Sequence, residues 1–225
     1  MRRLTFALVV IGLLACAGPA LAGVVFDNIT GTTDNFNVDG WLIANGYLVA
    51  DTFTLGSPTT VTGVNFWVSK YTSAAVTSVQ WSVISDVGLP TDGTTLYTAD
   101  ASVTDAFVEQ NKYSYYIDKI TFSTGGISLG AGTYWLELTT AVSTPGNEIY
   151  WDQSDGTNSI AWQGTVGYLA NTGSGCGGEG APGTSCTESF QVLSADTTAP
   201  EPGSLMLFGS GVLLLAGAWR RKFSR

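Results

Sequence analysis

The 225-residue sequence contains no histidine. This absence excludes Ser-His-Asp and Cys-His nucleophile systems, histidine-ligated zinc and copper, and an imidazole general base. Cysteine is also scarce. The chain has three cysteines, and one of them, Cys16, lies in a segment that we expect to be removed. Four-cysteine zinc sites and iron–sulfur clusters are therefore excluded as well.

Basic residues are almost absent from the middle of the chain. Between Asp27 and Asp196 three lysines stand against seventeen acidic residues, which gives this part a formal charge of −14. Such a surface repels phosphate backbones, so we expect no nucleic-acid partner. Aromatic residues make up 12% of the chain and β-branched residues are plentiful, a composition typical of a folded, secreted β-protein rather than of a disordered one.

The N-terminal segment, residues 1–22, has the layout of a secretory signal peptide. A basic start, an apolar run over residues 4–17 and the small residues Ala20 and Ala22 follow one another. This order predicts cleavage by signal peptidase before Gly23. Acylation of Cys16, which ends a lipobox-like sequence, is one alternative. An uncleaved anchor is another, although the run is shorter than the roughly 20 residues of a membrane span.

The C-terminal segment, residues 200–225, has three parts in a fixed order. A Pro-Glu-Pro triplet precedes an apolar stretch over 203–219 and a basic end over 220–225. At about 1.5 Å per residue, we expect this stretch to form one transmembrane helix across a thin bilayer, with the basic end on the cytoplasmic side. The triplet comprises Pro200, Glu201 and Pro202, and the basic cluster comprises Arg220, Arg221 and Lys222.

This order of triplet, short hydrophobic helix and basic end resembles the PEP-CTERM sorting tail of Gram-negative bacteria, which an exosortase recognises. The resemblance implies export, an intermediate anchored in the inner membrane, and processing near residues 200–202. It also implies delivery to the cell surface or to an exopolysaccharide matrix. Passages such as Val49–Leu55 and Leu129–Leu138 are similar to segments of uncharacterised PEP-CTERM proteins and imply no activity. A plain membrane anchor is the alternative.

Residues 23–199 are predicted to form one all-β domain. Apolar and polar residues alternate with a period of two, and turns rich in Gly, Pro, Asn and Asp interrupt the alternation. An antiparallel two-sheet sandwich of the jelly-roll-like type fits this many short strands. The expected strands are Val24–Asp27, Tyr47–Leu55, Val61–Ser69, Val76–Ser85, Leu96–Ala99, Tyr113–Phe122, Gly132–Thr139, Glu148–Gln153 and Phe190–Leu193.

Two cysteines remain after export. Cys176 and Cys186 enclose a glycine-rich segment. Because secreted proteins meet an oxidising environment, we expect a disulfide between them, and two free thiols are the alternative.

Carboxylates are the remaining groups able to support catalysis or bind a metal. Glu137, Glu148 and Asp152 are the best candidates for a glycosidase-type pair, but no spacing fixes a partner, so we expect no enzymatic activity and solvated carboxylates. A structural calcium ion would suit the oxygen donors of an acidic secreted protein, and Asx-turns are the alternative. The candidate ligands are Asp152, Asp155 and Asn158, and a second group is Asp27, Asn28 and Asp34.

Aromatic residues on the polar strand face indicate glycan binding. Strand alternation turns Trp67 and Trp135 toward that face, and Tyr150 lies beside acidic residues. Sugars stack their apolar face on such rings, whereas core tryptophans are the alternative. The sequence thus predicts an exported surface or matrix protein of unknown activity. The alternatives are a lectin-like module that binds exopolysaccharide and a two-carboxylate glycan-cleaving enzyme.

Overall fold

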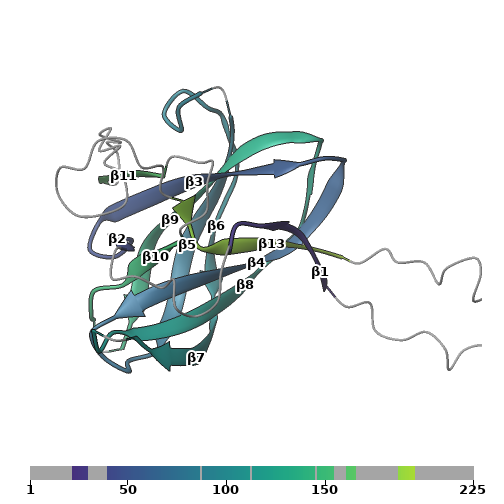
Figure 1. Cartoon of the computed structure of the whole chain (residues 1–225). Helices are drawn as coiled ribbons and strands as arrows, with labels where there is room; N and C mark the ends of the chain where they lie inside the picture. The colour runs from purple at the N-terminus through teal and green to yellow at the C-terminus, as the bar shows by residue number, and fades with distance from the viewer. Residues whose placement is uncertain are drawn as a thin grey trace, which may run out of the picture. The chain divides into compact units, whose positions relative to one another are not determined.

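The computed structural model describes residues 22–29, 40–86, 88–111, 113–144, 146–154, 161–165 and 187–195. All of them belong to one unit, Ala22–Ala195. Regular structure in these ranges consists of strands alone (Figure 1). No helix among them is long and apolar enough to cross a bilayer. The predicted signal-peptide residue Ala20, the Cys176–Cys186 disulfide, the Pro200–Pro202 triplet, the 203–219 helix and the basic cluster lie outside the described residues.

The larger sheet is organised around one long strand, β4 (Thr59–Lys70). Strand β8 (Tyr116–Leu129) pairs with one side of β4 and carries β7 (Thr104–Gln110) at its outer edge. On the other side, β13 (Phe190–Ala195) pairs with the first half of β4 and β10 (Tyr150–Ser154) with its end. The remaining strands are β1 (Ala22–Asp27) on β13, and β2 (Gly40–Leu42) and β12 (Thr187–Glu188) on β10.

The smaller sheet has five antiparallel strands. Their order is β11 (Trp162–Thr165), β3 (Tyr47–Leu55), β9 (Gly132–Ser143), β5 (Val76–Ser85) and β6 (Thr95–Ser102). The two antiparallel sheets confirm the all-β sandwich. The bounds of β3 and β5 match the sequence prediction, whereas β2, β7, β11 and β12 were not predicted.

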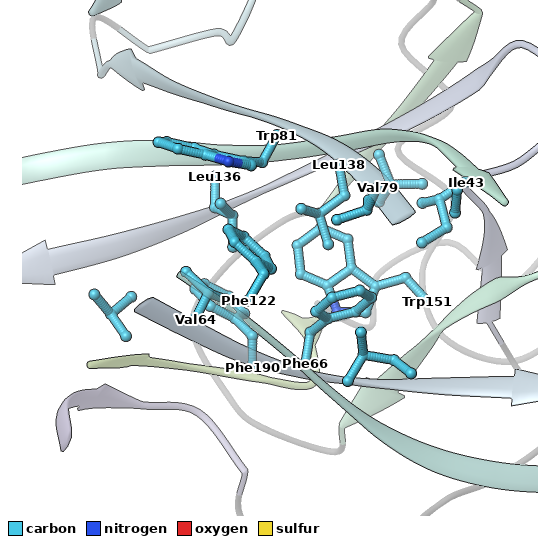
Figure 2. Packing of buried hydrophobic residues seen from close by; sticks show 14 of the residues in the cluster. Ile43, Val64, Phe66, Val79, Trp81, Phe122, Leu136, Leu138, Trp151 and Phe190 are labelled. Carbon is cyan, nitrogen blue, oxygen red and sulfur yellow. The ribbon is translucent and has the colours of Figure 1, made fainter. Parts of the chain in front are cut away.

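Large aromatic and aliphatic side chains from both sheets fill the space between them. In Figure 2, Trp81 and Leu136 lie on one side, and Phe66, Phe122 and Phe190 lie on the other. The rings of Trp81 and Phe122 stack with their centroids 5.8 Å apart. Because each fully buried side chain of this size contributes about 1.5–3 kcal/mol, this core is the main source of stability.

Gly63→Ala tests how closely β4 and β8 pack. A Cβ atom at residue 63 would lie 2.7 Å from the Phe122 carbonyl oxygen, so the backbone would have to move. We expect the free energy of unfolding to fall by about 1–3 kcal/mol, measured by urea denaturation. In the control Gly56→Ala a new Cβ meets nothing within 4 Å. The control should change the free energy by less than about 0.5 kcal/mol, and equal effects of the two variants would contradict this account.

Candidate functional site

The structure buries the first predicted glycan-binding residue, Trp135. Only 4% of its surface is exposed, and it packs with Ala50, Ile84 and Trp162 on the outer face of the smaller sheet. The indole N–H donates a hydrogen bond of 3.2 Å to Asp86 Oδ1. The expectation that Trp135 faces solvent was therefore wrong, because the unpredicted strand β11 brings Trp162 over this face.

Trp67 is also buried, with 9% of its surface exposed. The Lys119 ammonium lies 5.3 Å from the centre of its ring, a cation–π contact. Its neighbours on the same strand face, Asn65 and Ser69, are buried too, so this face of β4 does not present a polar surface to solvent. The expectation of an exposed Trp67 ring was therefore wrong, and the Lys119 side chain is one of the groups that lie over it.

The third predicted residue, Tyr150, belongs to a group of rings that we call the tyrosine cluster: Tyr71, Tyr115 and Tyr150. The centroids of the Tyr71 and Tyr115 rings are 4.7 Å apart, and those of Tyr71 and Tyr150 are 6.0 Å apart and nearly perpendicular. Tyr71 exposes 57% of its surface, and the other two are half-buried. The cluster thus presents one exposed ring, Tyr71, which packs against two half-buried rings.

Strand pairing brings the three tyrosines together. Tyr71 directly follows the last residue of β4, Tyr115 directly precedes β8, and Tyr150 is the first residue of β10. Within the sheet, the terminal residue Lys70 is paired with Tyr116, and Ser69 is paired with Tyr150. The end of β4 and the beginnings of β8 and β10 therefore meet at one end of the strands of the larger sheet.

The loop between β7 and β8 holds Tyr115 in place. Asn111 Oδ1 accepts hydrogen bonds of 3.0 Å from the backbone N–H groups of Tyr113 and Tyr115. The Asn111 N–H in turn donates to the Tyr115 carbonyl oxygen at 3.0 Å, which closes the loop. Ser114 adopts a left-handed conformation with φ of 69°. This bonding fixes the backbone of Tyr115 and limits the freedom that ligand binding would otherwise remove.

Polar side chains surround the rings. Tyr150 donates its hydroxyl hydrogen to Glu148 Oε2 at 2.5 Å, and Glu148 is exposed. Asn147 donates through Nδ2 to Thr72 Oγ1 at 2.9 Å, beside Tyr71. A carboxylate and an amide thus lie next to exposed aromatic surface, the combination that recognises sugar hydroxyls together with an apolar sugar face.

Hydrogen bonds and burial raise the pKa values of two cluster hydroxyls, those of Tyr115 and Tyr150. A hydrogen bond with Tyr71 and, to a lesser extent, burial raise the pKa of Tyr115 to about 12. Burial first, then the hydrogen bond to Glu148, raises the pKa of Tyr150 well above its ordinary value. Both groups therefore remain neutral hydrogen-bond donors over the whole physiological pH range.

Sequence reasoning identified Tyr150 and Glu148 but missed Tyr71 and Tyr115. Each missed tyrosine lies immediately outside a strand of the larger sheet, where alternation within a strand gives no information. The two tyrosines could have been found only from the pairing of β4 with β8 and β10, which brings them together at one end of these strands. That pairing was known only from the structure.

The three predicted catalytic carboxylates occupy different surroundings. Glu137 lies on β9 in the smaller sheet, where burial raises its pKa and a hydrogen bond from Ser82 partly opposes the rise. Glu148 is exposed, whereas Asp152 on β10 is fully buried, so the expectation that these groups are solvated was wrong for Asp152. No group of three metal-binding side chains forms among the described residues.

The predicted calcium ligands are only partly described. Asp155, Asn158 and Asp34 lie outside the described residues. Asp27 accepts the Ile29 N–H through Oδ1 at 2.9 Å, an Asx-turn. Asn28 donates to Thr187 Oγ1 at 2.7 Å and to the Glu188 carbonyl oxygen at 2.6 Å. The side chains of Asp27 and Asn28 are thus engaged in structural hydrogen bonds, and calcium binding stays a prediction.

A buried acid links the two sheets near this point. Asp51 on β3 accepts the Glu188 N–H at 2.6 Å and the Thr187 hydroxyl at 2.7 Å. The Glu188 side chain is fully buried. Burial first, and the charge of Asp51 second, raise the pKa of Glu188 well above its ordinary value.

Tyr71→Phe tests the hydrogen bond that raises the Tyr115 pKa. The variant keeps the ring and removes the hydroxyl, so we expect the Tyr115 pKa to fall from about 12 toward 10. Absorbance of tyrosinate during alkaline titration measures the shift. Because the folded-state pKa lies above the unfolded one, stability from this group is present below pH 10 and is lost as the pH rises toward 12. A Tyr115 transition that stays near pH 12 in Tyr71→Phe would refute the assignment.

Glu188→Gln tests the buried acid. Native Glu188 holds its proton more tightly than the unfolded chain does, so its stabilising effect decreases as the pH rises above 4.5. While one extra proton is bound, each pH unit removes about 1.4 kcal/mol. We therefore expect Glu188→Gln to flatten the dependence of unfolding free energy on pH, measured by urea denaturation at several pH values. The exposed control Asp92→Asn should keep the wild-type slope, and a wild-type slope in Glu188→Gln would disprove the prediction.

Comparison with known proteins identifies the C-terminal segment. A family model described as the PEP-CTERM protein-sorting motif matches residues 198–222. No curated protein matches the chain. The motif implies an exosortase as processing partner, export, and a sorting intermediate anchored in the membrane. The chain therefore carries a PEP-CTERM sorting motif, as the Pro-Glu-Pro triplet, apolar stretch and basic end predicted.

Proposed function

We propose that this chain is a non-enzymatic surface or matrix protein whose jelly-roll-like ectodomain binds a neutral polysaccharide through the tyrosine cluster. The observation that supports this proposal most directly is that Tyr71 contacts both Tyr115 and Tyr150 at one end of the strands of the larger sheet. It replaces the two tryptophans predicted from sequence, because buried rings cannot stack on a sugar.

The chemistry of the cluster favours a sugar over an apolar partner. The exposed Tyr71 ring offers a surface for the C–H face of a sugar, and Glu148 and Asn147 offer hydrogen-bonding groups beside it. The half-buried rings of Tyr115 and Tyr150 support Tyr71 from two directions. A platform that is ordered before binding loses little entropy when a ligand arrives.

The charge of the domain selects the class of polysaccharide. Residues 27–196 carry a formal charge of −14, and Glu148 accepts a hydrogen bond from Tyr150 beside the cluster. An acidic polymer would meet electrostatic repulsion over the whole surface. A neutral polysaccharide avoids this cost, and an acidic one would require calcium to bridge the like charges.

The position of the cluster suits a protein sorted through its C-terminal end. Residue Ser194 of β13 pairs with Val61 near the beginning of β4, whereas Tyr71 follows the end of β4. The cluster and the exit of the chain from the sandwich are therefore at opposite ends of one strand. The proposal also includes removal of residues 1–22 by signal peptidase, exosortase processing near residues 200–202, a transmembrane helix over 203–219, and the Cys176–Cys186 disulfide.

Affinity electrophoresis through gels that contain a neutral glucan or the cells' own exopolysaccharide tests the proposal. We expect the wild-type chain to be retarded and Tyr71→Ala to be retarded less. Loss of a ring contact of about 1 kcal/mol corresponds to a roughly fivefold rise in Kd. Gels with an acidic polysaccharide, with and without calcium, test the charge argument, and retardation is expected only when calcium is present.

Tyr97→Ala is the matched control. Tyr97 is an exposed tyrosine on β6, and its hydroxyl donates to the carbonyl oxygen of Ser128, near the far end of β8 from Tyr116. This variant should bind as the wild type does. Unretarded migration of folded wild-type protein in every gel, or equal loss in both variants, would overturn the assignment of the site.

A further inference from the structure

A buried amine lies against two carboxyl groups one residue before Tyr71 of the tyrosine cluster. Lys70, the last residue of β4, has no exposed side-chain surface, and the Asp105 and Asp118 side chains are 9% and 7% exposed. Lys70 Nζ contacts Asp118 Oδ2, donates to Asp105 Oδ2 at 3.2 Å and donates to the Ala74 carbonyl oxygen at 2.6 Å. All three ammonium hydrogens therefore have acceptors, and two of these acceptors are carboxyl oxygens.

Strand register places these groups on the inner face of the larger sheet. The three residues come from adjacent strands: β4, β8 and β7. Asp118 pairs with Val68, two residues before Lys70, and Asp105 pairs with Ile120, two residues after Asp118. Val68 and Ile120 belong to the hydrophobic core, so the same alternation directs the three reactive groups away from water.

We propose that Lys70 and Asp118 condense into an isopeptide bond that joins β4 covalently to β8, with Asp105 carrying the proton. The reaction needs only these three side chains. It adds to the proposed glycan-binding function and does not depend on it, because it concerns side chains of β4, β7 and β8 rather than the tyrosine cluster itself.

The atoms and charges of the step balance. Asp105, as a carboxylate, takes one proton from the Lys70 ammonium, and the free amine attacks Cγ of the protonated Asp118 carboxyl. A C–N bond forms and gives a tetrahedral intermediate. Asp105 relays a proton from this nitrogen to the Asp118 hydroxyl, which leaves as water when the Cγ–O bond breaks. The products are a secondary amide, one water molecule and a protonated Asp105.

The surroundings of the two aspartates assign their roles. Asp105 Oδ2 accepts the Val76 N–H at 2.6 Å as well as the Lys70 ammonium at 3.2 Å, and these bonds hold the oxygen where it can take the Lys70 proton. Burial first, and the adjacent Asp105 carboxyl next, raise the pKa of Asp118 to about 6. A protonated carboxyl is the better electrophile. Asp118 Oδ1 is buried and has no hydrogen-bond partner in the described part of the chain.

The enclosed site favours condensation over the ion pair. Two opposite charges in a poorly hydrated interior have a large desolvation cost, and the amide carries no charge. Condensation also removes one of the two Asp118 oxygens from an interior that satisfies only one of them. Groups held in this way reach effective concentrations of about 10⁵–10⁸ M, which drives amide formation although water opposes it in solution.

Peptide mass spectrometry of the full chain, exported and purified in detergent, tests the proposal. After denaturation, trypsin should fail to cut at Lys70. The peptide 113–119 should be found joined to the peptide that contains residue 70 and ends at Lys112. The product should have two N-termini, which distinguishes it from a linear peptide of equal mass left uncut at Lys112. Fragmentation should place the branch between Lys70 and Asp118.

Variants separate the chemical roles from folding. Lys70→Met and Asp118→Ala should give no branched peptide. Asp105→Asn keeps the side-chain volume but removes the base, so it should give mostly unbranched peptides while near-ultraviolet circular dichroism shows a folded domain. The exposed variant Asp100→Asn should branch as the wild type does.

The wild-type result decides between a covalent bond and an ion pair. If folded wild-type protein, incubated near the Asp118 pKa of about 6, releases peptide 113–119 unmodified and is cut after Lys70, the isopeptide bond does not form. Full branching in Asp105→Asn would retain the bond but overturn the role of Asp105. Neither result bears on glycan binding, which the Tyr71→Ala comparison measures separately.

Discussion

The pairing of β4 is the constraint on which the other features of the domain depend. This twelve-residue strand pairs along its length with β8 on one side and with β13 and then β10 on the other. Because side chains alternate between the two faces of a strand, the register of β4 determines which side chains of β4, β8, β10 and β13 contact one another. A shift by one residue would place Phe66 and Lys70 on the outer face and would separate the three tyrosines.

The sequence predicted the fold class because the alternation is strong in the long strands. Strands β3 and β5 were predicted to the residue, since each carries clear apolar alternation between turn-forming residues. The four missed strands are short or lie at sheet edges, where few positions face the core. Of these, β11 mattered most, because its Trp162 covers Trp135 and turns a predicted binding residue into a packing residue.

The candidate site was less predictable than the fold for a physical reason. Tyr150 was identified from its own strand, but Tyr71 contacts Tyr150, and Tyr115 contacts Tyr71, only through pairings between segments that are distant in sequence. Alternation describes one strand at a time and carries no information about register. The same limit applies to Lys70, Asp105 and Asp118, which the sequence places far apart and the sheet brings together.

Buried polar groups hold this sandwich together at two places where apolar packing ends. Asp51 joins β3 of the smaller sheet to β12 of the larger one, and Lys70 joins β4 to both β7 and β8. Groups within the protein form most of the hydrogen bonds of Asp51 and Lys70, so each of the two residues specifies one arrangement of neighbouring strands. An exported domain gains from such specification, since local opening is where proteolysis begins.

The antiparallel pairing of β13 with β4 has a mechanical consequence. A force applied to the chain at Ala195 and resisted by a ligand held at Tyr71 would pull these two strands in opposite directions along their length. The hydrogen bonds between Phe190–Ser194 and Val61–Phe66 lie across that direction. They would share the tension together instead of opening one after another, so the domain would resist shear between a tethered end and a held polymer.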